Sequence, residues 1–167
     1  MRFEIEEQPV WDEEKRRLLL ETYNYSFPVE KMELGAPLPQ IWGCLIDDDD
    51  SVLGFMYITS WKENEGGDGG EAEDEISLVV DSSVQTRGFG SVLLEKAEEY
   101  LRSKDILLAT VRVQPSNPRA YELIDWFYRK DYICYWPGFN GNEPKNLEFA
   151  KKTVGRQDVT LKKNLSQ

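Results

Sequence analysis

The segment from Ile76 to Leu94 places the strongest constraint on the fold, because it joins a strand to a helix through a turn with two glycines. Residues 76–80 are apolar apart from one serine, which is typical of a buried strand. Residues from about Gly88 to Arg102 then carry apolar side chains at helical spacing, namely Val92, Leu93, Leu94, Ala97 and Leu101. The first N–H groups of a helix have no partner within it and lie at the positive end of its dipole. The segment therefore predicts an anion-binding site at the start of this helix.

The glycines of this turn, Gly88 and Gly90, suit a phosphate ligand because a side chain would hold the phosphate away from the backbone. Arg87 adds a cation beside them. A mononucleotide-binding loop would continue with Lys and then Ser or Thr, whereas Ser91 and Val92 follow here. A dinucleotide-binding turn would need a third glycine, which this segment lacks. For the loop taken alone, a purely structural turn remains an alternative.

Alternating apolar residues and turn signals divide the chain into strands and helices. The predicted strands are residues 2–7, 41–46, 52–59, 76–80, 106–113, 132–135 and 147–152. The predicted helices start at Asp12, near Gly88, and at Pro118 with Asn117 as its cap. This order predicts an α+β fold with a mixed, mostly antiparallel sheet flanked by helices. We expect one domain over residues 1–154, a polar tail at residues 155–167 and a mobile acidic loop at residues 62–75.

The chain has no histidine, which excludes Ser-His-Asp and Cys-His nucleophilic sites and removes the commonest zinc ligand. A general acid or base must therefore be Glu, Asp, Tyr, Lys or Cys. Cys44 and Cys134 lie in apolar surroundings and are expected to be buried hydrophobic residues rather than a disulfide. The aspartates from Asp47 to Asp50 lack the alternating spacing of a calcium loop, so we expect a solvated turn and no metal site.

Acidic residues outnumber basic ones by 31 to 20, which gives the chain a net charge of −11. This charge disfavours binding to nucleic acid or to an anionic membrane and favours a cationic partner, although a need for solubility alone would also explain it. No apolar run approaches the roughly 18–20 residues that cross a bilayer, and the first seven residues lack the core of a signal peptide. We therefore expect a cytoplasmic protein.

Residues 78–90 read Leu-Val-Val-Asp-x-x-x-Gln-x-x-Gly-x-Gly, which resembles the central motif of the GNAT acetyltransferase superfamily. Gln85, Gly88 and Gly90 match the family signature Gln/Arg-x-x-Gly-x-Gly/Ala. Further along, Asn-Pro-Arg-Ala from Asn117 is similar to the start of the next family motif. The resemblance spans roughly residues 41–153, and it implies the GNAT acyl-CoA N-acyltransferase fold with acetyl-CoA as the co-substrate.

The resemblance also implies where acetyl-CoA would bind. The CoA pyrophosphate would contact backbone N–H groups of residues 86–91, and the pantetheine would lie along the end of strand 76–80. A backbone N–H near Val80 would polarise the thioester carbonyl while an amine attacks it directly in a ternary complex. The expected binding residues are Leu78, Val79, Val80, Gln85, Thr86, Arg87, Gly88, Phe89, Gly90, Ser91 and Asn117.

The family's general acid is a tyrosine that lies seven residues after the asparagine, a position held here by Ile124. A helix one turn longer than the family pattern would bring Tyr128 to that place, whereas an alignment on the helix end selects Phe127. Tyr121 is a second candidate for the acid. Glu75, at the start of the central strand, is the predicted base, with a solvated acidic loop as the alternative interpretation.

The sequence thus predicts an N-acetyltransferase that acts on a primary amine of a small molecule or a peptide. The net charge favours a cationic acceptor, and exposed edge strands near the C-terminus are compatible with a homodimer. Two other classes remain open: an acyl-CoA-binding module without turnover, and an interaction domain whose acidic loop binds a basic protein.

Overall fold

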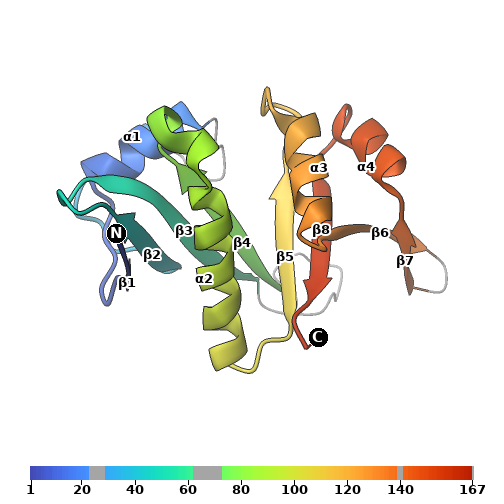
Figure 1. The fold of residues 1–167 in the computed structure, drawn as a ribbon, viewed down its shortest axis with the longest axis horizontal. Helices are drawn as coiled ribbons and strands as arrows, with labels where there is room; N and C mark the ends of the chain where they lie inside the picture. The colour runs from blue at the N-terminus through green and yellow to red at the C-terminus, as the bar shows by residue number, and fades with distance from the viewer. Residues whose placement is uncertain (23–28, 62–72, 139–140, 167) are drawn as a thin grey trace. The chain divides into compact units, whose positions relative to one another are not determined.

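The computed structural model describes residues 1–22, 29–61, 73–138 and 141–166. Within these ranges the chain forms eight strands, four α-helices and one 3-10 helix (Figure 1). In chain order they are β1 (Arg2–Ile5), α1 (Glu13–Glu21), β2 (Ile41–Ile46), β3 (Val52–Trp61), β4 (Glu73–Val80), η1 (Ser82–Arg87), α2 (Phe89–Ser103), β5 (Leu108–Val113), α3 (Ala120–Arg129), β6 (Ile133–Gly138), β7 (Gly141–Lys145), α4 (Leu147–Val154) and β8 (Val159–Asn164).

The strands form one mixed sheet in the order β1-β2-β3-β4-β5-β8-β6-β7. The pairs β1–β2, β2–β3, β5–β8, β8–β6 and β6–β7 are antiparallel, and β4–β5 is parallel. This arrangement confirms the predicted α+β class. By its internal contacts the chain divides into two units, which are described separately: unit 1 comprises residues 1–60 and 76–104, and unit 2 comprises residues 61–75 and 105–167.

In unit 1, α1 begins at the predicted position, because the Asp12 carboxylate accepts a hydrogen bond of 2.9 Å from the N–H of Lys15. Leu18 and Leu19 of this helix are buried against aromatic residues of β2 and β3. The rings of Trp42 and Tyr57 stack there, with centroids 4.5 Å apart. The hydrophobic core of unit 1 therefore joins α1 to the sheet.

Lys15 is fully buried within this core. Its ammonium group contacts the carboxylates of Asp12 at 2.9 Å and Glu6 at 3.0 Å. It also lies 5.3 Å from the ring centroid of Trp42 and 5.2 Å from that of Phe55. A buried charge is tolerated only where such partners replace its lost hydration, so the position of α1 depends on this cluster.

In unit 2, residues 147–152 form helix α4, so the prediction of a strand there is wrong. Their alternation of apolar and polar residues suits a strand, but Asn146 caps a helix by accepting a hydrogen bond of 2.9 Å from the N–H of Phe149. The buried side chains Ala150 and Val154 then lie one turn apart on the inner face. In Figure 1, α4 lies beside α3, and an ion pair of 2.8 Å between Lys151 and Asp125 joins the two helices.

Residues 155–167 do not form the expected polar tail, since they contain β8, which lies between β5 and β6. Within β8, Val159 and Leu161 are buried with the less buried Thr160 between them, which is the two-residue period of a strand, and Leu165 is buried just beyond the strand. Because this alternation is short and includes lysines, the sequence pattern does not predict a strand here.

Other boundaries move by a few residues. β4 starts at Glu73, so the end of the acidic stretch is strand rather than loop, and residues 62–72 lie outside the described ranges. β6 extends beyond the predicted strand at residues 132–135, and it pairs with the unpredicted strand β7. α3 starts at Ala120 instead of Pro118, and the Asn117 side chain closes a turn by accepting from the N–H of Arg119 at 2.8 Å.

Within the described ranges, no helix has the length and apolar character needed to cross a bilayer.

Both cysteines are free and buried, as predicted. Burial raises the pKa of the Cys44 thiol to about 12 and also raises the pKa of the Cys134 thiol. Because the thiolate is the reactive form, we expect neither cysteine to react with Ellman's reagent in the native protein at about pH 8, and both to react after denaturation. Rapid labelling of a native cysteine would contradict this prediction. Confirmation would also show that a thiol-release assay has a low background on this protein.

Candidate functional site

The turn after β4 has a defined conformation. Residues 82–87, which belong to the predicted turn between the strand and the helix, form the 3-10 helix η1, and Gly88 separates η1 from α2. Gly88 has a φ of +82°, in the left-handed region, while a Cβ added at this position would meet no atom within 4 Å. Glycine is therefore required here by the backbone conformation and not by lack of space.

The start of α2 has the features of an anion site. The helix is 15 residues long, no side chain caps its N-terminus, and its first turn contains no acidic residue. Arg87 is exposed at this end, with its guanidinium 5.7 Å from the ring centroid of Phe89. Uncapped N–H groups, the helix dipole and a nearby cation together fit the phosphate groups of a nucleotide-type ligand. The predicted site at Gly88, Phe89, Gly90 and Ser91 thus has donors of the right kind.

The end of β4 presents its residues on alternating faces. Val79 is buried in the core beside α1, whereas Leu78 and Val80 are half-buried. The side-chain amide of Gln85 donates to the Val80 carbonyl at 3.3 Å, which ties the loop back to the strand. Gly54 of β3 lies close by, since a Cβ there would be 2.6 Å from the Val79 carbonyl oxygen. Figure 1 shows α2 beside these two strands of unit 1.

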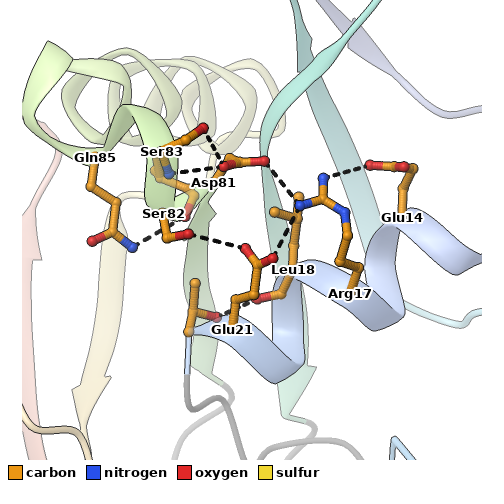
Figure 2. A network of polar contacts seen from close by, with 10 residues as sticks. Glu14, Arg17, Leu18, Glu21, Asp81, Ser82, Ser83 and Gln85 are labelled. Carbon is orange, nitrogen blue, oxygen red and sulfur yellow. Dashed lines mark hydrogen bonds and ion pairs between the residues drawn. The ribbon is translucent and has the colours of Figure 1, made fainter.

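A polar network that no sequence pattern predicted joins α1 to the same loop (Figure 2). The Asp81 carboxylate caps η1 by accepting from the N–H of Ser83 at 2.9 Å, and its second oxygen accepts from Arg17 at 3.0 Å. Arg17 also contacts Glu14 at 2.9 Å and Glu21 at 3.2 Å. An Asp-Ser-Ser sequence after a strand signals a capping residue, but no local pattern indicates a partner 64 residues away.

A cavity of about 480 Å³ opens beside this network in unit 1. Its lining includes Glu14, Arg17 and Asp81, together with Asp47 and Asp50 of the β2–β3 turn. Because the charged residues of this lining are four carboxylates and one guanidinium, the cavity does not extend the anion site.

The predicted base, Glu75, lies on β4 within unit 2 rather than in a solvated loop. Its side chain is 13% exposed, and its carboxylate is 3.5 Å from the Nε of Arg112 on β5. Glu75 also lies opposite Thr110 in the β4–β5 pairing. A partly buried carboxylate held by a guanidinium has a defined position, which a general base requires.

The predicted acid, Tyr128, lies in the last turn of α3 in unit 2. Its hydroxyl donates to the Lys145 carbonyl at 2.7 Å and accepts from the N–H of Cys134 at 3.1 Å. Burial raises the pKa of Tyr128. The hydroxyl thus joins α3 to β6 and to the end of β7, and the catalytic role stays a prediction.

The other candidates for the acid differ in exposure. The Phe127 side chain is buried against Tyr132, with ring centroids 5.7 Å apart. Tyr121 is 55% exposed on α3. Binding of acetyl-CoA by Asn117, whose side chain closes the turn before α3, also stays a prediction.

The family model described as Acetyltransferase (GNAT) family matches residues 4–127 of the chain. A search of curated protein sequences found no match. Among solved structures, the chain is similar to a ribosomal-protein-S18-alanine N-acetyltransferase from Escherichia coli, with 13% identity and a TM-score of 0.54, over 99% of this chain and 96% of that one.

Two other similar structures are named as aminoglycoside acetyltransferases. One is an aminoglycoside 6'-acetyltransferase type Ii, with 18% identity and a TM-score of 0.56, over 100% of this chain and 99% of that one. The other is an aminoglycoside 6'-N-acetyltransferase complexed with coenzyme A, with 17% identity and a TM-score of 0.57, over 100% and 98%. At these identities the similarity shows the fold alone. Because the family model covers most of its length, the chain belongs to the GNAT acetyltransferase family, and its fold is that of the acyl-CoA N-acyltransferases.

Proposed function

We propose that this protein transfers an acetyl group from acetyl-CoA to a primary amine of a small molecule or a peptide. The observation that carries this proposal is the uncapped N-terminus of α2, which follows a left-handed Gly88 and an exposed Arg87 in a chain of the GNAT family. These are the donors that a CoA pyrophosphate requires.

In this proposal the backbone N–H groups of residues 86–91 hold the pyrophosphate, and Arg87 adds a positive charge. The half-buried edge formed by Leu78 and Val80 accommodates the pantetheine, and the N–H of Val80 stabilises the negative charge that develops on the acyl oxygen. Bound acetyl-CoA supplies the activated thioester. The acceptor amine attacks it directly in a ternary complex, so no covalent enzyme intermediate forms.

We propose Glu75 as the group that removes the proton of the acceptor amine, with Arg112 orienting its carboxylate. Replacement of Glu75 by Gln is therefore expected to lower kcat by roughly 100-fold, without a matching loss of acetyl-CoA affinity. Steady-state kinetics and calorimetry measure the two quantities. Asp74 is the matched control, because the two-residue period of β4 places it on the opposite face, and Asp74→Asn should retain kcat. Equal activity of Glu75→Gln and the unchanged protein would contradict this role.

Tyr128 is the proposed acid for the departing thiolate, and this role requires its hydrogen bond to the Lys145 carbonyl to be released when substrates bind. The Tyr128→Phe variant distinguishes a catalytic acid from a residue whose hydroxyl only stabilises the fold. A folded variant with a much reduced kcat supports the acid. A loss of stability of about 1 kcal/mol with unchanged kcat supports the structural role and directs attention to Tyr121.

The engaged hydroxyl of Tyr128 favours one alternative, an acyl-CoA-binding protein without turnover. Calorimetry with acetyl-CoA, followed by a thiol-release assay over polyamines, aminoglycosides and lysine peptides, separates the two functions. Binding with turnover supports the enzyme, and binding without turnover on any of these amines supports the alternative. Absence of binding would overturn both.

We propose a cationic acceptor, because the net charge is −11 and the similar solved structures include enzymes named for aminoglycosides. The proposal includes a cytoplasmic location, with neither nucleic acid nor membrane as a partner. β1 and β7 are the outer strands of the sheet order and offer edges for a homodimer.

A further inference from the structure

We propose that Arg17 is the counter-ion of Asp81, and that this pairing protects the affinity of the neighbouring loop for its anionic co-substrate. The inference rests on the proposed function, since it assigns a role in CoA binding to a helix that lies outside the family's central motif. The role proposed for Arg17 is that of a positioning residue, because Arg17 acts through Asp81 and does not contact the ligand.

Asp81 is held firmly at the start of η1. Its backbone N–H donates to the Leu53 carbonyl at 2.9 Å, and one carboxylate oxygen accepts from both the N–H and the hydroxyl of Ser83, at 2.9 and 2.7 Å. These hydrogen bonds lower the pKa of Asp81, and Arg17 lowers it further. A negative charge therefore stands at the start of η1, the 3-10 helix that leads into the proposed phosphate site at the start of α2.

Arg17 is placed to cancel this charge. Its guanidinium is 3.0 Å from the free carboxylate oxygen of Asp81, and contacts with Glu14 and Glu21 hold it in that orientation. Glu21 also accepts a hydrogen bond of 3.3 Å from the hydroxyl of Ser82. Figure 2 shows these side chains converging from α1 and from η1. Loss of Arg17 would leave three neighbouring carboxylates without the cation that they share.

The Asp81 carboxylate is only 16% exposed, so water screens its charge incompletely. Charge effects of this kind act over about a Debye length, roughly 8 Å at physiological ionic strength. An uncompensated carboxylate on the segment that leads into the proposed phosphate site should therefore weaken the binding of a polyanion more than that of a neutral ligand.

The test compares acetyl-CoA affinity, measured by calorimetry, in Arg17→Gln, Asp81→Asn and the double variant. Asp81→Asn keeps an oxygen that can accept from Ser83, so the cap of η1 is retained. We expect Arg17→Gln to bind about fivefold more weakly, an effect of the size of one partly exposed ion pair. The double variant should return to within about twofold of the unchanged protein. At about 1 M salt the loss in Arg17→Gln should largely disappear, because the Debye length falls to ~3 Å.

Two control variants isolate the charge. Arg17→Lys keeps a cation and should bind nearly as well as the unchanged protein. Arg16→Gln makes the same change of net charge on the same helix. The guanidinium of Arg16 forms no ion pair with the part of the chain that the structure describes, so this variant should bind acetyl-CoA normally. Thermal unfolding verifies that each variant is folded.

Unchanged affinity in Arg17→Gln would overturn the inference, and so would a loss that persists in the double variant, because the effect would then arise from the shape of η1 rather than from charge. Failure of the proposed function has a different signature, since the unchanged protein itself would then not bind acetyl-CoA.

Discussion

Replacement of Gly90 by Leu is expected to weaken acetyl-CoA binding by a factor on the order of 1,000, or about 4 kcal/mol. Gly90 lies in the first turn of α2, where the backbone N–H groups have no side-chain cap. A leucine side chain there would stand between these donors and the phosphates, and each charge-assisted hydrogen bond so lost is worth roughly 1.5–3 kcal/mol. Leucine has a higher helix propensity than glycine, so the fold should be retained.

Calorimetry with acetyl-CoA measures the loss of binding, and circular dichroism during heating verifies that the variant is folded. Ser103→Leu is a matched control, because it adds the same side chain at an exposed position at the other end of α2. It should bind acetyl-CoA normally. If folded Gly90→Leu retained its affinity, the anion site at the start of α2 would be wrong, and the proposed function would lose its main support.

Replacement of Asp12 by Ala is expected to lower the free energy of unfolding by about 2–3 kcal/mol. About 1 kcal/mol comes from the lost cap of α1. The remainder comes from the buried ammonium of Lys15, which would keep Glu6 as its one close carboxylate among the described residues. This part is smaller than for a fully buried pair, because the Asp12 side chain is 43% exposed.

Urea denaturation separates the two contributions. Asp12→Asn keeps an oxygen for the cap but removes the charge, so it should lose less stability than Asp12→Ala. In a Lys15→Met background the buried charge is absent, and Asp12→Asn should then be nearly neutral. Equal losses in the two backgrounds would show that Asp12 acts as a cap alone.

Local patterns in the sequence are sufficient for much of the fold and for the candidate anion site. The apolar strand before Val80, the paired glycines at 88 and 90 and the amphipathic α2 are encoded in adjacent residues, so they could be predicted without tertiary information. The cap of α1 by Asp12 is equally local. The family signature lies in this same segment, which explains why the family could be recognised.

The predictions fail where two local structures fit one pattern. Residues 147–152 alternate like a strand, yet Ala150 and Val154 also share a helix face, and packing against α3 decides for the helix. β8 is short and rich in lysine, so its place inside the sheet depends on the neighbours β5 and β6 rather than on its own propensity.

The sequence by itself determined the strand–glycine turn–helix at residues 76–103, because capping, periodicity and backbone freedom depend on near neighbours. Tertiary structure alone decided which polar groups meet across long separations: Arg17 with Asp81, Glu75 with Arg112, and Tyr128 with the Lys145 carbonyl. The physical reason is that a charged or hydroxyl side chain can find many equivalent partners in an unfolded chain, and the packing of distant elements selects one of them.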